Sequence, residues 1–124
     1  MLGYLTLVAW TVNASIGLWM HGVKRFPIGV VLAHASIVAV GYVAWITYLA
    51  LDRPPTVGWF AVVWLLVANG VGDAAVVRRW KKKADGGKGL VGTYLQRIKR
   101  PALLSHAVGA GVTTGLAIVT LLVA

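Results

Sequence analysis

The sequence contains no cysteine and only three acidic residues in a chain of 124. The absence of cysteine excludes disulfide bonds, thiolate metal sites, iron–sulfur clusters and thiol catalysis. Charged residues of both signs make up only 12% of the chain, whereas 59% of the residues are hydrophobic. This composition is far from that of an average soluble domain and indicates an integral membrane protein.

Long apolar stretches account for most of the chain. A helix needs roughly 20 apolar residues to cross a hydrocarbon core of about 30 Å. Stretches of about that length are residues 2–21, 28–51, 57–77 and 102–124. We therefore predict an all-α fold, in which four transmembrane helices form one membrane domain over residues 1–124. The N-terminus lacks the basic segment of a cleaved signal peptide, so we expect the first stretch to be retained as a span.

The basic residues predict the orientation of the bundle. Of the twelve Lys and Arg residues, two lie between the first and second spans, nine lie in the loop 78–101, and Arg53 alone lies in the second loop. By the positive-inside rule, the first and third loops are cytoplasmic and both termini face outward. We expect a multi-pass protein of a bacterial-type plasma membrane.

The net charge of +9 is carried by segments that flank membrane helices. We expect no nucleic-acid partner, because no known nucleic-acid-binding module fits into a loop of this size. The basic residues nearest the predicted cytoplasmic interface are Lys24, Arg25, Lys99 and Arg100. We predict that they contact anionic lipid headgroups or the propionates of a bound haem.

One pattern occurs twice in the chain. A basic pair, a proline and a histidine followed by alanine appear in KRFPIGVVLAHAS and again in KRPALLSHAVG. Residues 3–17 also resemble residues 58–73, with Asn13 aligned to Asn69 after a shift of one residue. The similarity indicates either a duplicated helical hairpin or the chance resemblance of two apolar hairpins. Duplicated hairpins would run parallel and would be related by an axis along the membrane normal.

Polar side chains inside membrane spans are costly and usually mark functional sites. The predicted spans contain His34, His106, Asp73, Asn13 and Asn69. At 1.5 Å per helical residue, the two histidines and Asp73 lie roughly 8 to 10 Å inside the cytoplasmic edge, and the asparagines lie about one turn deeper than Asp73. We predict that Asp73, Asn13 and Asn69 form a polar network in the bundle interior, close to the histidines.

Two histidines at one depth on the second and fourth spans suit axial ligation of a haem iron from opposite sides. Small residues near them would leave room for a porphyrin: Ala33, Ala35, Ser36, Ser105, Ala107 and Gly109. The arrangement resembles, in general architecture, the four-helix b-type cytochromes and the haem-bearing anchor subunits of membrane oxidoreductases. This resemblance rests on the two histidines, and it implies haem b as cofactor, His34 and His106 as ligands, and one-electron transfer.

Three function classes stay open. The first is a haem-binding or quinone-linked electron-transfer subunit that uses His34 and His106. The second is a non-catalytic accessory or scaffold subunit, in which the polar residues only fix helix packing, and the third is a small proton-coupled transporter that uses Asp73. No catalytic residues and no metal other than a haem iron are predicted, because a hydrolytic metal site would need a further general base. We expect a homo-oligomer or a subunit of a larger membrane complex, since little of the chain lies outside the membrane.

Overall fold

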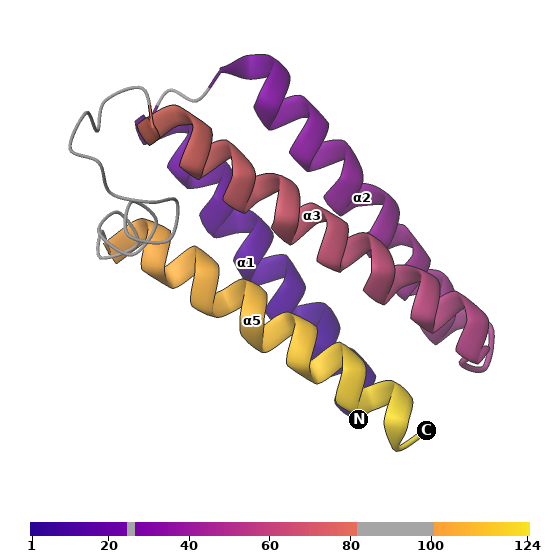
Figure 1. The fold of residues 1–124 in the computed structure, drawn as a ribbon. Helices are drawn as coiled ribbons and strands as arrows, with labels where there is room; N and C mark the ends of the chain where they lie inside the picture. The colour runs from indigo at the N-terminus through magenta and orange to yellow at the C-terminus, as the bar shows by residue number, and fades with distance from the viewer. Residues whose placement is uncertain (25–26, 82–100) are drawn as a thin grey trace.

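The computed structural model describes residues 1–24, 27–81 and 101–124. Within these ranges it has the helices α1 (Leu2–Lys24), α2 (Ile28–Ala50), α3 (Pro55–Lys81) and α5 (Pro101–Leu122) (Figure 1). Each of them is long and apolar enough to cross a membrane. The predicted bundle of four membrane-spanning helices is confirmed.

Prolines mark the beginnings of three helices. Pro27 directly precedes α2, and α3 and α5 begin at Pro55 and Pro101. Proline is favoured at this place because the first backbone N–H groups of a helix have no partner within it. Between α2 and α3 the chain reverses through Asp52 and Arg53, which adopt positive φ angles of 52° and 63°. The helix ends lie within a few residues of the predicted spans.

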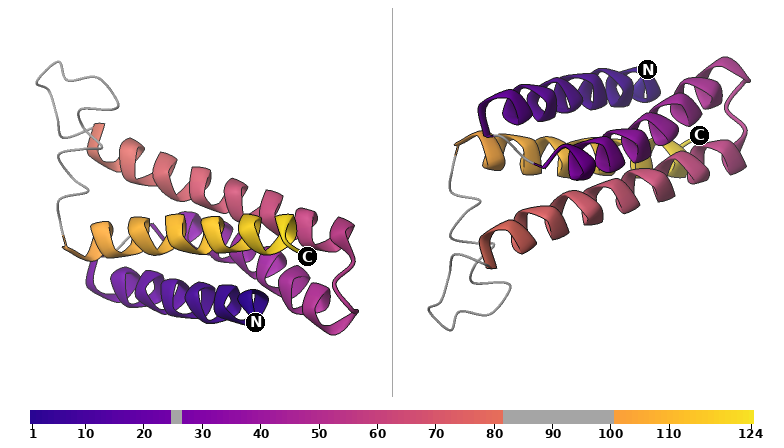
Figure 2. Two further views of the ribbon diagram at one scale, coloured as in Figure 1. Left: turned by 90° about the horizontal axis from the view of Figure 1, so that it is seen from below. Right: turned by 90° about the horizontal axis from the view of Figure 1, so that it is seen from above.

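The helices form a four-cornered bundle in which α1 and α3 lie diagonally opposite each other (Figure 2). The most extensive contacts join α2 to α3 and α1 to α5, and smaller ones join α3 to α5 and α1 to α2. Both termini lie at the end of the bundle where α2 turns into α3 (Figure 1). This arrangement agrees with the prediction that the two termini are on the same side of the membrane.

Contacts in the first hairpin recur in the second. A Cβ atom on Gly3 of α1 would contact Leu49 of α2, and a Cβ atom on Gly58 of α3 would contact Leu121 of α5. Gly3 and Gly58 are 55 positions apart in the chain, and Leu49 and Leu121 are 72 positions apart. The bundle therefore has an approximate twofold axis that exchanges α1 with α3 and α2 with α5. This regularity supports a duplicated hairpin.

The same spacing corrects the alignment made from the sequence. A constant separation of 55 residues pairs Asn13 with Ala68, without the shift that aligned Asn13 with Asn69. Both paired side chains are buried, whereas Asn69 is only half-buried. Asn13 and Asn69 therefore do not occupy equivalent positions: Asn13 lies on the buried face of α1, whereas Asn69 lies on a half-buried face of α3.

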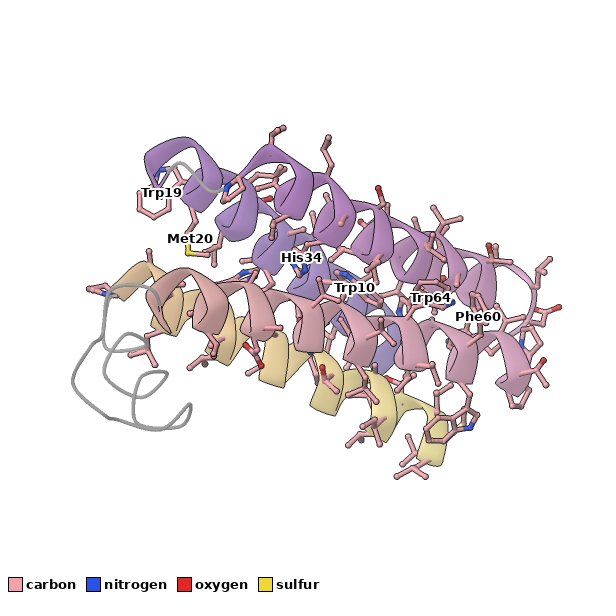
Figure 3. The ribbon with its side chains drawn as sticks, turned by 45° about the horizontal axis from the view of Figure 1, so that its top comes forward. Trp10, Trp19, Met20, His34, Phe60 and Trp64 are labelled. Atoms are coloured by element: carbon pink, nitrogen blue, oxygen red, sulfur yellow. The ribbon has the colours of Figure 1, made fainter. Side chains whose placement is uncertain are left out.

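The hydrophobic core lies mainly in the half of the bundle near the termini. Its largest fully buried side chains are Trp10, Trp45, Tyr48 and Val62. The indole Nε1 of Trp45 donates a hydrogen bond to the carbonyl of Gly3 at 3.0 Å, which ties α2 to α1. Figure 3 shows His34 nearer the opposite end, between Met20 and Trp10.

Candidate functional site

The two histidines approach each other across the bundle. His34 of α2 and His106 of α5 lie with their ring centres 6.3 Å apart and their planes inclined by 74°. Both side chains are half-buried. They are 72 positions apart, the same separation as Leu49 and Leu121, so they are equivalent under the twofold axis. Because the axis exchanges the two histidines, the space between their rings lies on or close to that axis.

Each histidine packs on a glycine of a neighbouring helix. A Cβ atom on Gly72 of α3 would lie 3.2 Å from Cε1 of His34, and one on Gly17 of α1 would lie 3.0 Å from Cε1 of His106. The sequence analysis missed both glycines as site residues. The signal was available, because Gly17 and Gly72 are separated by the same 55 positions as Gly3 and Gly58.

Hydrogen bonding differs between the two rings. Nδ1 of His106 donates to the backbone carbonyl of Asn13 at 3.2 Å, since a carbonyl oxygen can only accept. The equivalent carbonyl for His34 belongs to Ala68, which faces the ring as a backbone hydrogen-bond acceptor. This contact is weaker than the one at His106, because the buried Nδ1 of His34 does not reach full hydrogen-bond geometry with any described residue. His106 is therefore held in one ring orientation more firmly than His34.

The side chain of Asn13 also contacts the helix that carries His106. In the amide orientation that pairs donors with acceptors, its nitrogen donates to the His106 carbonyl at 2.9 Å and lies 3.1 Å from the ring Nδ1. Its oxygen accepts from the Ala110 N–H at 3.2 Å. This approach requires Gly109, because a Cβ atom there would lie 2.5 Å from the end of the Asn13 amide, at the position that its nitrogen occupies in this orientation. Asn13 thus lies beside His106 and joins α1 to α5 at this level.

The other predicted members of the polar network lie apart from Asn13. Asn69 donates from Nδ2 to Thr114 Oγ1 at 3.1 Å, which joins α3 to α5. Asp73 is exposed on the surface of the bundle and not buried in its interior, although it acts electrostatically on both histidines. The structure therefore does not bring Asp73, Asn13 and Asn69 together, because equal depth on a helix does not determine the direction in which a side chain points.

Most of the small residues that were expected to leave room beside the histidines do not line the space between the two rings. Ala33, Ala35, Ser36 and Ser105 are exposed and face away from the bundle interior. Arg25, Lys99 and Arg100 lie outside the described residues, as does most of the basic loop. The described residues contain no group of three or more His, Cys, Asp or Glu side chains that could hold a metal ion.

Comparison with protein families, with curated proteins and with solved structures finds no match for this chain. The chemistry of the site is then the guide to function. It consists of two facing imidazoles, one backbone acceptor, one amide and two glycines, and it contains no nucleophile and no buried carboxylate. Such a set can bind a ligand between the rings, but it is poorly suited to hydrolysis, which needs a general base and a water-accessible cleft.

Proposed function

We propose that this chain is a small membrane electron-transfer protein that binds a b-type haem between His34 and His106. The observation that carries the proposal is the approach of two equivalent histidines to 6.3 Å across the bundle. Two imidazoles that coordinate one metal ion from opposite sides, through bonds of about 2 Å, have ring centres roughly 6 Å apart. The observed separation is suited to two imidazoles that would hold one metal ion between them.

The donor set favours haem over a bare metal ion. A structural zinc site uses four protein ligands and a catalytic zinc site uses three, whereas only two imidazoles converge here among the described residues. A porphyrin supplies four nitrogen ligands in its own plane, so two axial histidines complete the coordination of iron. The inclination of 74° between the ring planes is compatible with axial ligands that lie nearly perpendicular to each other.

The surroundings of the rings support the same interpretation. In the tautomer of His106 that is protonated at Nδ1, donation to the Asn13 carbonyl leaves Nε2 unprotonated and able to bind a metal. Gly17 and Gly72 provide positions without side-chain bulk next to the two rings. A flat macrocycle that contacts neighbouring helices needs such positions, since any Cβ atom there would occupy the space beside its ligand.

A haem with two protein ligands would supply one-electron transfer at this site. The residues of the chain would hold the group at a constant depth and exclude water through the surrounding apolar helices. The basic residues Lys24, Arg25, Lys99 and Arg100 would pair with propionates or with anionic lipid headgroups at the cytoplasmic face. The electron donor or acceptor would be a quinone or another membrane subunit, which makes an oligomer or a larger complex the expected setting.

Absorbance spectroscopy tests the proposal directly. The purified protein, produced in cells supplied with haem precursor, should show a Soret band and, after reduction with dithionite, a sharp α band. His34→Ala and His106→Ala should each alter or abolish these bands, because each removes one axial ligand. His21→Ala is the matched control and should leave the spectrum unchanged. A well-folded protein from such cells without any Soret band would refute the haem proposal.

A non-catalytic scaffold subunit is the second candidate. It is favoured by the contacts of Asn13, whose amide and carbonyl connect α1 to α5 without any cofactor. Hydrogen bonds between membrane helices contribute about 0.6 kcal/mol on average. If this candidate is correct, His106→Ala should lower the melting temperature of a colourless protein and weaken its co-purification with partner subunits.

A further inference from the structure

We propose that the two histidines are unequal ligands. His106 is the permanent ligand, and His34 is exchangeable, so that a neutral diatomic molecule such as CO or NO binds to the reduced iron on the His34 side. This inference rests on the proposed haem function and specifies how that site is regulated. It is carried by differences between positions that the approximate twofold axis makes equivalent.

The first difference is the hydrogen bond at Nδ1. His106 donates to the Asn13 carbonyl at 3.2 Å, whereas the buried Nδ1 of His34 has only the weaker contact with the Ala68 carbonyl. A metal-binding histidine that donates its other N–H to an acceptor is held in orientation and becomes a more basic ligand. His106 is therefore the stronger of the two ligands.

The second difference is the anchoring of the ligand helix. The amide of Asn13 contacts the His106 carbonyl and the Ala110 N–H, so it holds the turn of α5 that carries His106. The equivalent of Asn13 in the second copy is Ala68, whose methyl side chain cannot hydrogen-bond. Ala68 therefore cannot hold α2 near His34 in the way that the side chain of Asn13 holds α5 near His106.

The third difference is the packing of the two helices. None of the residues from Pro27 to Val40 of α2 is buried, and Gly29 has no atoms of other residues within 4 Å of where its Cβ would lie. By contrast, Leu103 of α5, just before His106, is only 7% exposed. Figure 1 shows α2 and α3 diverging from the turn that joins them toward the beginning of α2. Displacement of His34 thus disrupts fewer buried contacts than displacement of His106.

These differences also indicate the class of the incoming ligand. The ligand would replace His34 beside Gly72, within a bundle of apolar helices where burial of a charge is costly. A neutral molecule of two atoms is small enough to enter there without separating the helices. Reduced haem iron binds such ligands when one axial position is free.

Titration with CO tests the inequality of the ligands. The dithionite-reduced wild-type protein should bind CO, detected as a shift of the Soret band. His34→Ala should retain haem and bind CO at least tenfold faster, because the exchangeable ligand is already absent. His106→Ala should lose most of its haem during purification. Gly70→Ala is the control on α3, since a Cβ atom there would contact nothing within 4 Å.

A second pair of variants addresses the case in which a histidine variant fails to fold. Gly72→Ala presses on His34, and Gly17→Ala presses on His106, with similar contacts of 3.2 Å and 3.0 Å to Cε1. We expect Gly72→Ala to retain haem and bind CO faster, and Gly17→Ala to lose haem. Haem retained in His106→Ala but lost in His34→Ala, or a haem-loaded wild type that binds no CO, would overturn this inference alone. Absence of haem from the wild type would overturn the proposed function with it.

Discussion

At the scale of single residues, glycines decide how closely the helices approach at the site. Gly17 and Gly72 allow the two histidine rings to lie against α1 and α3, and Gly109 allows Asn13 to reach the backbone of α5. Small residues serve this purpose in membrane bundles, where close packing replaces the hydrophobic effect between helices. The histidines and Gly109 were noted from the sequence, but Gly17 and Gly72 were not, because a chain with 15 glycines offers many candidates until their common spacing is recognised.

The substitution Gly109→Ala tests the contact between Asn13 and α5. A Cβ atom at this position would lie 2.5 Å from the end of the Asn13 amide, so the amide must move and its hydrogen bonds must weaken. We expect a loss of stability of about 1 to 3 kcal/mol, the usual cost of overpacking. Thermal unfolding in detergent measures it. Gly111→Ala is the control, because a Cβ atom there would contact nothing within 4 Å. Equal melting temperatures for the two variants would contradict the contact.

At the scale of helices, polar contacts join segments that are far apart in the chain. Thr6 of α1 and Thr120 of α5 have their hydroxyl oxygens 3.3 Å apart, and both side chains are buried. Each hydroxyl has a single proton, so one of them donates to the other while that second hydroxyl donates to a backbone carbonyl of its own helix. The interface between α1 and α5 therefore has a polar contact near the termini as well as the one that Asn13 makes near His106.

A double-mutant cycle on Thr6→Val and Thr120→Val measures this interaction between helices. We expect a coupling energy of about 0.6 kcal/mol, the average for hydrogen bonds between membrane helices. Reversible unfolding in mixed micelles provides the free energies. Thr47→Val is the control for Thr6→Val, since Thr47 donates within its own helix to the Val43 carbonyl. A coupling between Thr47 and Thr120 as large as that between Thr6 and Thr120 would show that the effect is not specific.

At the scale of the whole molecule, the two hairpins form one interlocked unit. The most extensive contacts, α2 with α3 and α1 with α5, both run between the two hairpins and not within them. Consequently the site is complete only when both hairpins are present, since each contributes one histidine and one glycine. The two histidines then lie at the same depth because the twofold axis runs along the bundle.

The absence of native cysteine makes the topology easy to test. Single variants Thr56→Cys and Ala124→Cys carry their thiols at exposed positions near the end of the bundle that holds the termini. We expect both to react with a membrane-impermeant maleimide added to intact cells, because the positive-inside rule places this end outside. Gly87→Cys, in the basic loop, should react only after the membrane is permeabilised. The opposite labelling pattern would reverse the predicted orientation.

The sequence by itself determined the properties that depend on position along a span. Hydrophobic length defined the four helices, basic residues predicted which loops are cytoplasmic, and counting from the loops put His34 and His106 at one depth. The tertiary structure decided which faces meet: the histidines point toward each other, whereas Asp73 points outward at a similar depth. The physical reason is that lipid is as apolar as most of these side chains, so hydrophobicity hardly distinguishes a helix face that meets lipid from one that meets a helix. Rotation and neighbours depend on close packing at glycines such as Gly17 and Gly72, which exists only in the assembled bundle.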